Sequence, residues 1–76
     1  MVFEMVQELL SQCVGCDASR ITPSTVILED LEATPADLVD VMLGLEEALP
    51  ISWQEEDLDE LVTVADLVRY LEAQID

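Results

Sequence analysis

The chain has 76 residues, of which 51% are hydrophobic, and this is enough apolar material for one small core. Its formal net charge is −16, because 18 carboxylates are balanced by only two arginines and no lysine. Nucleic acid and anionic membranes are excluded as partners, since both would repel such a surface. The mean hydropathy of +0.34 argues against disorder, which requires low hydrophobicity together with high charge. We therefore expect a folded, acidic, monomeric domain over residues 1–76.

The N-terminal residues Met1–Met5 lack the basic region, the apolar core and the cleavage site of a secretion signal. The longest uninterrupted apolar run, Val41–Leu43, is far shorter than the roughly 20 residues of a membrane span. These features predict a cytoplasmic protein that does not insert into membranes.

The first predicted element is a helix that ends near Val14 and Gly15. Its apolar residues recur three and four positions apart and form one stripe: Val2, Met5, Val6, Leu9, Leu10 and Cys13. Glycine just after such a stripe is a typical helix stop. Cys13 and Cys16 form a Cys-x-x-Cys pair, but the chain has no His or further Cys to complete a zinc site. We interpret the pair as incidental, with a labile local disulfide as the alternative.

Residues 16–33 are predicted to form one long irregular connection, because Ser, Thr, Pro and Asp interrupt any regular pattern. A loop of this length is uncommon in a small domain. Its isolated apolar residues are expected to pin it to the core: Ile21, Ile27, Leu28 and Leu31.

The second predicted helix runs from Pro35 to about Leu49, where Pro50 stops it. Thr34 can cap the helix, Pro35 suits the first helical position, and Asp37 completes a capping pattern. The first turn is therefore specified by local chemistry alone.

This helix has three kinds of face. The predicted core stripe is Leu38, Val41, Met42, Leu45 and Leu49, and the mostly acidic stripe is Asp37, Asp40, Gly44 and Glu47. Val39 and Leu43 lie four residues apart beside the acidic stripe. An apolar pair framed by carboxylates predicts a docking surface for a basic, apolar partner. The alternative is that Val39 and Leu43 only widen the core.

A short acidic helix is predicted from Gln54 to Leu61, held by Trp53, Leu58 and Leu61. The last helix follows a second capping pattern, Thr63–Asp66, and its apolar face is Val64, Leu67, Val68 and Leu71. These elements predict an all-α fold, a small four-helix bundle.

Enzymatic activity is not expected, because the chain has neither His nor Lys to act as a base or electrophile, and no glycine-rich loop for phosphate. Neighbouring carboxylates such as Glu46 and Glu47 are typical of solvated acidic faces. No EF-hand spacing is present, so no metal site is predicted.

The chain resembles the acyl carrier proteins over nearly its whole length, without a gap. The resemblance is carried by Ile27–Leu31, which is similar to the approach to the family's attachment site, by Leu45–Leu49, by Thr63 with Val64, and by Tyr70. It implies a four-helix bundle with a long loop between helices 1 and 2 and a short helix 3. It also implies a surface that meets basic patches on partner enzymes: Asp37, Asp40, Glu46 and Glu47, with Val39 and Leu43 as its apolar part.

The chain departs from the family's pattern at the attachment site, where an Asp-Ser-Leu motif normally opens the second helix and the serine carries phosphopantetheine. Residues 34–36 here are Thr, Pro and Ala, so Pro35 stands at the serine position and has no hydroxyl. Glu32 replaces the preceding glycine. Thr34 is the nearest substitute, but backbone amides at the helix start need its oxygen.

Trp53 and Leu58 fall on positions that, by resemblance, carry smaller residues lining the acyl cavity. Their larger side chains would help to fill that hollow, and the alternative is a differently packed core.

The resulting hypothesis is an acyl-carrier-like domain that serves as a protein-interaction or regulatory module, without a cofactor. Its partner would present a basic patch and could be an enzyme of acyl, polyketide or peptide biosynthesis. The alternative is an unconventional carrier in fatty acid, polyketide or related biosynthesis, loaded noncovalently or at another hydroxyl such as Ser24, where phosphopantetheine could be attached. A third interpretation is an unrelated acidic bundle.

Overall fold

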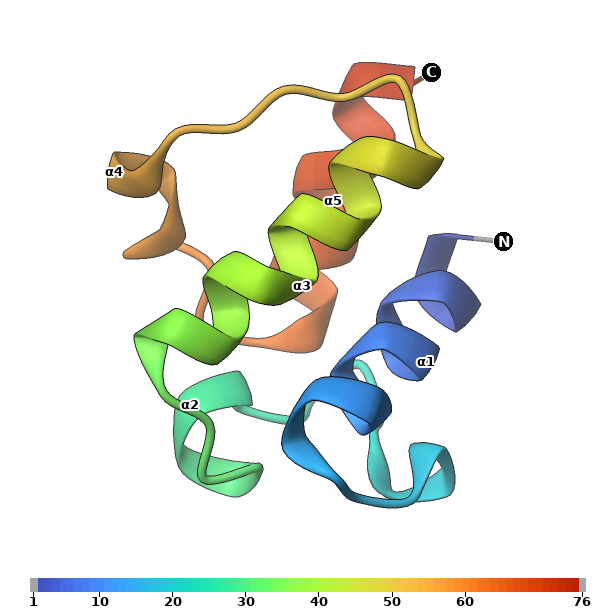
Figure 1. The fold of residues 1–76 in the computed structure, drawn as a ribbon, viewed down its shortest axis with the longest axis vertical. Coiled ribbons are helices and arrows are strands. Elements are labelled where there is room, and N and C mark those ends of the chain that lie inside the picture. Colours follow the sequence, from blue (N-terminus) through green and yellow to red (C-terminus); the bar gives the residue numbers. More distant parts are fainter. Residues whose placement is uncertain (1, 76) are drawn as a thin grey trace.

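The computed structural model describes residues 2–75, and these form helical segments joined by loops (Figure 1). The segments are α1 (Val2–Val14), η1 (Ala18–Arg20), α2 (Ile27–Asp30), α3 (Pro35–Ala48), α4 (Glu55–Leu58) and α5 (Val64–Ile75). Within this range there is no β-strand, and the all-α prediction is confirmed. No helix in this range has both the length and the apolar character needed to cross a bilayer.

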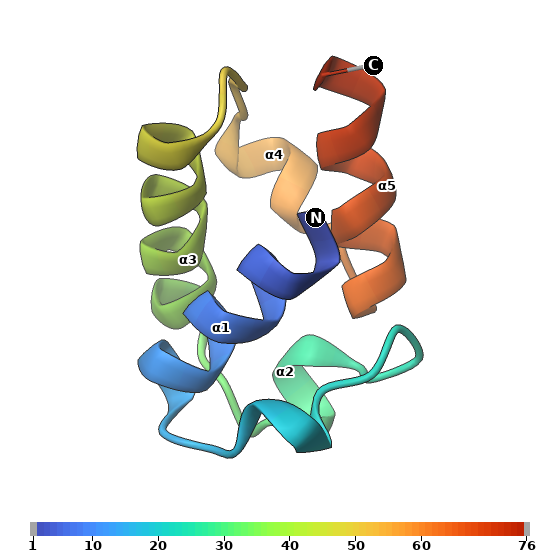
Figure 2. The same ribbon diagram turned by 90° about the vertical axis from the view of Figure 1, so that its right-hand side faces the viewer.

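The longer helices enclose one apolar core. In Figure 2, α3 and α5 stand upright on either side, and α1 crosses in front and contacts both. The two views together place α1 and α4 on opposite sides of α3. The buried apolar side chains come from α1, α2, α3, α5 and the loops: Val6, Leu10, Ile21, Ile27, Leu38, Val41, Met42, Leu45, Ile51, Leu61, Val64, Leu67 and Leu71.

The bounds of the long helices agree with the predicted ones, and α4 is shorter than predicted. The chain leaves α4 after Leu58 because Asp59 and Glu60 form a turn. The N–H of Leu61 donates to the carbonyl of Leu58 at 3.2 Å, and this turn carries the Leu61 side chain into the core. The following residues are then free to start α5.

The connection between α1 and α3 contains η1 and α2. Hydrogen bonds join it to α1 and to the segment before α5. Gln7 Nε2 on α1 donates to the carbonyls of Ala18 at 2.7 Å and Ile21 at 3.0 Å. The N–H of Ile27 donates to the carbonyl of Val62 at 3.0 Å. Backbone partners of this kind allow a long loop to pack over a core without unpaired polar groups.

Two sequence predictions about apolar residues are wrong. Leu28 does not pin the connection to the core, because α2 buries Ile27 instead and leaves Leu28 41% exposed. Cys13 is exposed and not part of the buried stripe of α1, because it lies in the last turn, beside the acidic start of α3. Ile21 is buried and Leu31 packs against the core, as predicted.

Trp53 and Leu58 are half-buried and pack against the core cluster. The α4 segment between them is tied to α5, because the Tyr70 hydroxyl donates to Asp57 Oδ2 at 2.8 Å. Burial and this neighbouring carboxylate raise the pKa of Tyr70.

Candidate functional site

The start of α3 has the geometry that its sequence predicts. The N–H of Asp37 donates to Thr34 Oγ1 at 3.2 Å, and the N–H of Thr34 donates to Asp37 Oδ2 at 3.0 Å. Pro35 occupies the first helical position, where its missing N–H costs nothing. The side chains of Thr34 and Asp37 are therefore both engaged in starting the helix.

The chain reaches this helix start through a left-handed residue. Glu32 has φ of +53°, a conformation that costs a residue with a Cβ roughly 1–2 kcal/mol and costs glycine almost nothing. By the family resemblance, this is a glycine position. The backbone thus retains a turn that suits glycine, while the sequence supplies glutamate.

The outward face of α3 carries an apolar pair among carboxylates. Leu43 is 48% exposed and Val39 is half-buried, and neither packs against the core cluster. The alternative that this pair only widens the core is therefore wrong. The carboxylates of Asp40, Glu46 and Glu47 are exposed on the same helix. Asp37 is half-buried, and one of its oxygens accepts the Thr34 N–H.

One flank of α3 faces α1. A Cβ on Gly44 would lie 3.2 Å from Leu9 Cδ2, so the two helices approach closely at this residue. Nearby, partial desolvation of the largely exposed Cys13 thiol, together with the charges of Asp40 and Asp37, raises its pKa. A raised pKa leaves the thiol protonated and a poor nucleophile at neutral pH. Both cysteines are free thiols in the structure.

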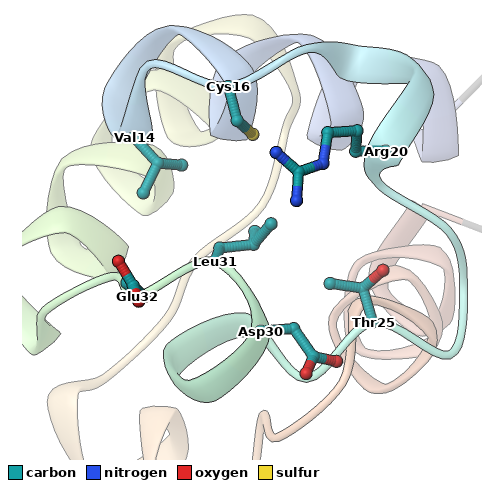
Figure 3. A pocket seen from close by; sticks show the side chains of 7 residues that line it. All are labelled: Val14, Cys16, Arg20, Thr25, Asp30, Leu31 and Glu32. Carbon is teal, nitrogen blue, oxygen red and sulfur yellow. The ribbon is translucent and has the colours of Figure 1, made fainter.

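A cavity of about 580 Å³ lies between the end of α1, η1 and the segment before α3 (Figure 3). The residues that line it are Val14, Cys16, Arg20, Thr25, Asp30, Leu31 and Glu32. The guanidinium of Arg20 points into this space, with Cys16 and Leu31 on either side in Figure 3. One carboxylate oxygen of Asp30, Oδ2, accepts a hydrogen bond from the Val26 N–H at 2.8 Å.

The sequence did not predict this cavity, because its walls come from segments that only the fold brings together. Among residues 2–75, no group of three or more His, Cys, Asp or Glu side chains is placed to hold a metal ion.

Comparisons with known proteins identify the family. The family described as "phosphopantetheine attachment site" matches residues 4–71 of the chain. The acyl carrier protein of Thermotoga maritima is 31% identical over 74 residues, which cover 97% of this chain and 91% of that protein. The acyl carrier protein of Clostridium acetobutylicum is 33% identical over 73 residues, covering 96% and 95%. The chain therefore belongs to the acyl carrier protein family.

Membership in this family implies a phosphopantetheine group, and the side chains at the start of α3 can be tested for their fit to it. Covalent attachment needs a free hydroxyl. The Pro35 ring has none, and Thr34 Oγ1 accepts a backbone N–H in the cap. The residues present at this helix start do not fit attachment of the group.

Proposed function

We propose that this acyl-carrier-like domain acts as a non-enzymatic protein-interaction module that docks through α3, and that it is not a conventional carrier. The observation that carries the proposal is the reciprocal cap between Thr34 and Asp37 around Pro35. In this arrangement, the residues at the position that the resemblance assigns to attachment stabilise a helix. Such a cap contributes about 1 kcal/mol.

The charge of α3 and its neighbours supports a basic partner. No lysine or arginine occurs in α2, α3 or α4, because the two arginines lie in η1 and α5. Exposed carboxylates therefore surround Leu43 and Val39 without local compensation. Such a surface favours a partner that presents Lys or Arg around an apolar contact, and the charges would accelerate association at low salt.

Charge reversal on α3 tests this docking surface. In the double variant Asp40→Lys/Glu47→Lys, we expect loss of the proteins that the wild-type chain retains from a lysate of its source organism. The matched control is Glu8→Lys/Glu72→Lys, which changes the net charge equally at exposed positions on α1 and α5. Equal retention by the α3 variant and the control would remove α3 as the interface.

The alternative, an unconventional carrier, is favoured by the relatives, which are named acyl carrier proteins. Ser24 offers an exposed hydroxyl, whose Oγ lies 3.2 Å from Thr22 Oγ1. Purification from the source organism followed by mass measurement and lipid extraction separates the two functions. A bound lipid, or a modification mapped to Ser24, would support the carrier; an unmodified, lipid-free chain supports the interaction module.

A further inference from the structure

A second apolar surface lies between α2 and the segment that joins α4 to α5. It is a cleft of about 240 Å³. The residues that line it are Val26, Leu28, Glu29, Leu58, Asp59, Leu61 and Val62. At its edges, Leu28 is 41% exposed and Val62 is 51% exposed. Leu28 and Val62 line the same cleft and so form one apolar patch instead of two isolated exposed side chains, and contiguous apolar patches mark interaction sites.

The walls of the cleft are held in place by the backbone. Val26 and Thr63 form an isolated antiparallel bridge, and the Ile27 N–H donates to the Val62 carbonyl at 3.0 Å. On the α4 side, the Tyr70 hydroxyl holds Asp57 at 2.8 Å. These bonds fix Leu28 and Val62 on the outside while Ile27 is buried. The cleft is thus formed before any partner arrives.

The size and charge of the cleft limit what it can hold. Sites for small molecules and cofactors usually measure roughly 300–1,000 Å³, so about 240 Å³ suits one or two protein side chains better. Glu29 and Asp59 line the cleft, and the neighbouring Asp30 and Glu60 are exposed. An apolar side chain flanked by Lys or Arg would satisfy both the cleft and its acidic edge.

The cleft lies on the side of the molecule that the Val39 flank of α3 faces, whereas Asp40, four residues before Gly44, lies on the flank toward α1. Gly44 marks the flank of α3 that touches Leu9 of α1. Val39 precedes Gly44 by five residues and so lies about 140° around the helix from it, facing away from α1. Because α1 and α4 are on opposite sides of α3, the Val39 flank faces the side where α4 lies (Figures 1 and 2). One partner could therefore cover α3 and the cleft together.

We propose that this cleft, between α2 and the segment that joins α4 to α5, anchors an apolar side chain of a partner protein. The partner is the same basic protein that docks on α3. The inference rests on the proposed function for the existence of that partner and adds what the partner must carry. The occupant is a surface segment of that partner with a leucine-sized side chain between Lys or Arg residues, matching the apolar cleft and its acidic edge.

The test uses the full chain labelled with ¹⁵N and a short helical peptide of leucines and lysines. A second peptide of the same charge, with serines in place of the leucines, is the control. We expect the leucine peptide to shift the amide signals of Leu28, Leu58 and Val62, and the serine peptide to leave them in place. Equal shifts with both peptides would show that charge alone is sensed and would overturn the anchor.

Variants of the cleft supply an independent measurement. Leu28→Ser/Val62→Ser should weaken binding of the leucine peptide about tenfold, which corresponds to about 1.4 kcal/mol, because it makes both exposed apolar edges of the cleft polar. Ile75→Ser is the matched control, because Ile75 is 36% exposed at the end of α5, away from the cleft. Loss of affinity in the control to the same extent overturns the proposal. The circular dichroism of all variants should match the wild type, because the altered residues are largely outside the core.

The peptide spectra separate failure of the anchor from failure of the docking surface. Shifts at Val39 and Leu43 without shifts at the cleft would overturn the anchor and leave the proposed function standing. Shifts at the cleft without shifts on α3 would keep the anchor and overturn α3 as the interface. Concentration-dependent shifts of the cleft without peptide, or shifts induced by laurate and not by the peptide, would assign the cleft to a second copy or to a lipid and overturn the proposal.

Discussion

The starts of α3 and α5 have almost the same sequence and very different surroundings. Residues 34–37 read Thr-Pro-Ala-Asp, and residues 63–66 read Thr-Val-Ala-Asp. Both form a reciprocal threonine–aspartate cap, with N–H to oxygen distances of 3.2 and 3.0 Å at α3 and 3.1 and 3.1 Å at α5. The second residue of each motif differs in burial, since Val64 is completely buried and Pro35 is exposed.

The start of α5 is also joined to the rest of the fold. The Val64 N–H donates to the Thr25 carbonyl at 3.0 Å, and the Ala65 N–H donates to the Pro23 carbonyl at 2.9 Å. The start of α3 instead stands at the surface. The comparison teaches that a capping pattern determines where a helix begins, while tertiary packing determines whether that beginning is a structural junction or an accessible site.

The largest expected effect comes from truncating the second residue of each motif. Val64→Ala should destabilise the fold by about 2 kcal/mol, because it removes two buried methyl groups and leaves a cavity. Pro35→Ala should cost at most about 0.5–1 kcal/mol, because it only increases the freedom of the unfolded chain. Urea unfolding followed by circular dichroism measures both changes, and equal losses would contradict the distinction between the two helix starts.

Removing the threonine of each cap should give stability losses that differ less from each other. Thr63→Ala and Thr34→Ala each remove a cap worth about 1 kcal/mol. We expect the larger loss at Thr63, where the cap is partly buried and an unpaired backbone N–H is harder to hydrate. The urea midpoints of the two variants show which cap contributes more to stability. A larger loss for Thr34→Ala than for Thr63→Ala would contradict the prediction.

Replacing the left-handed residue before α3 should stabilise the chain. Glu32→Gly relieves a backbone strain of roughly 1–2 kcal/mol in the folded state. Glycine also raises the entropy of the unfolded chain, which destabilises the fold by at most about 1 kcal/mol. The expected net gain in the free energy of unfolding is about 0.5 kcal/mol. Glu32→Ala keeps the Cβ and serves as the control for loss of charge. A gain from alanine equal to that from glycine would assign the effect to charge.

The smallest effect concerns acid pH at the start of α5. The Thr63 N–H and then the Arg69 guanidinium hold the pKa of Asp66 below its usual 3.8. Because the folded pKa is the lower one, ionised Asp66 stabilises the fold above the unfolded pKa, and this contribution is lost as pH falls through the folded pKa. The stability difference between wild type and Asp66→Asn should therefore shrink below about pH 4. A difference that stays constant with pH would contradict this assignment.

Local signals in the sequence were sufficient for the helix starts and most of the core. Both capping patterns are confirmed, and the apolar stripe of α3 is buried except at its last member, half-buried Leu49, where the helix has already ended. These features depend on residues within four positions of one another. A single sequence contains that information directly.

The cleft at Leu28 and Val62 could not be predicted in this way. It depends on the hydrogen bond between Ile27 and Val62, which are 35 positions apart and show no sequence pattern. The cavity at Arg20 is likewise built from segments that meet only after folding. The docking face proposed for α3 could be predicted because its carboxylates and its apolar pair occur within a single helix.

Intact-mass measurement after incubation with a broad-specificity phosphopantetheinyl transferase and coenzyme A tests the central claim most directly. The wild-type chain is predicted to keep its mass, while the variant Thr34→Asp/Pro35→Ser/Ala36→Leu gains one phosphopantetheine group. An authentic acyl carrier protein in the same reaction confirms that the transferase is active. A stoichiometric mass gain on the wild-type chain, mapped to Thr34 or to any serine, would contradict the account.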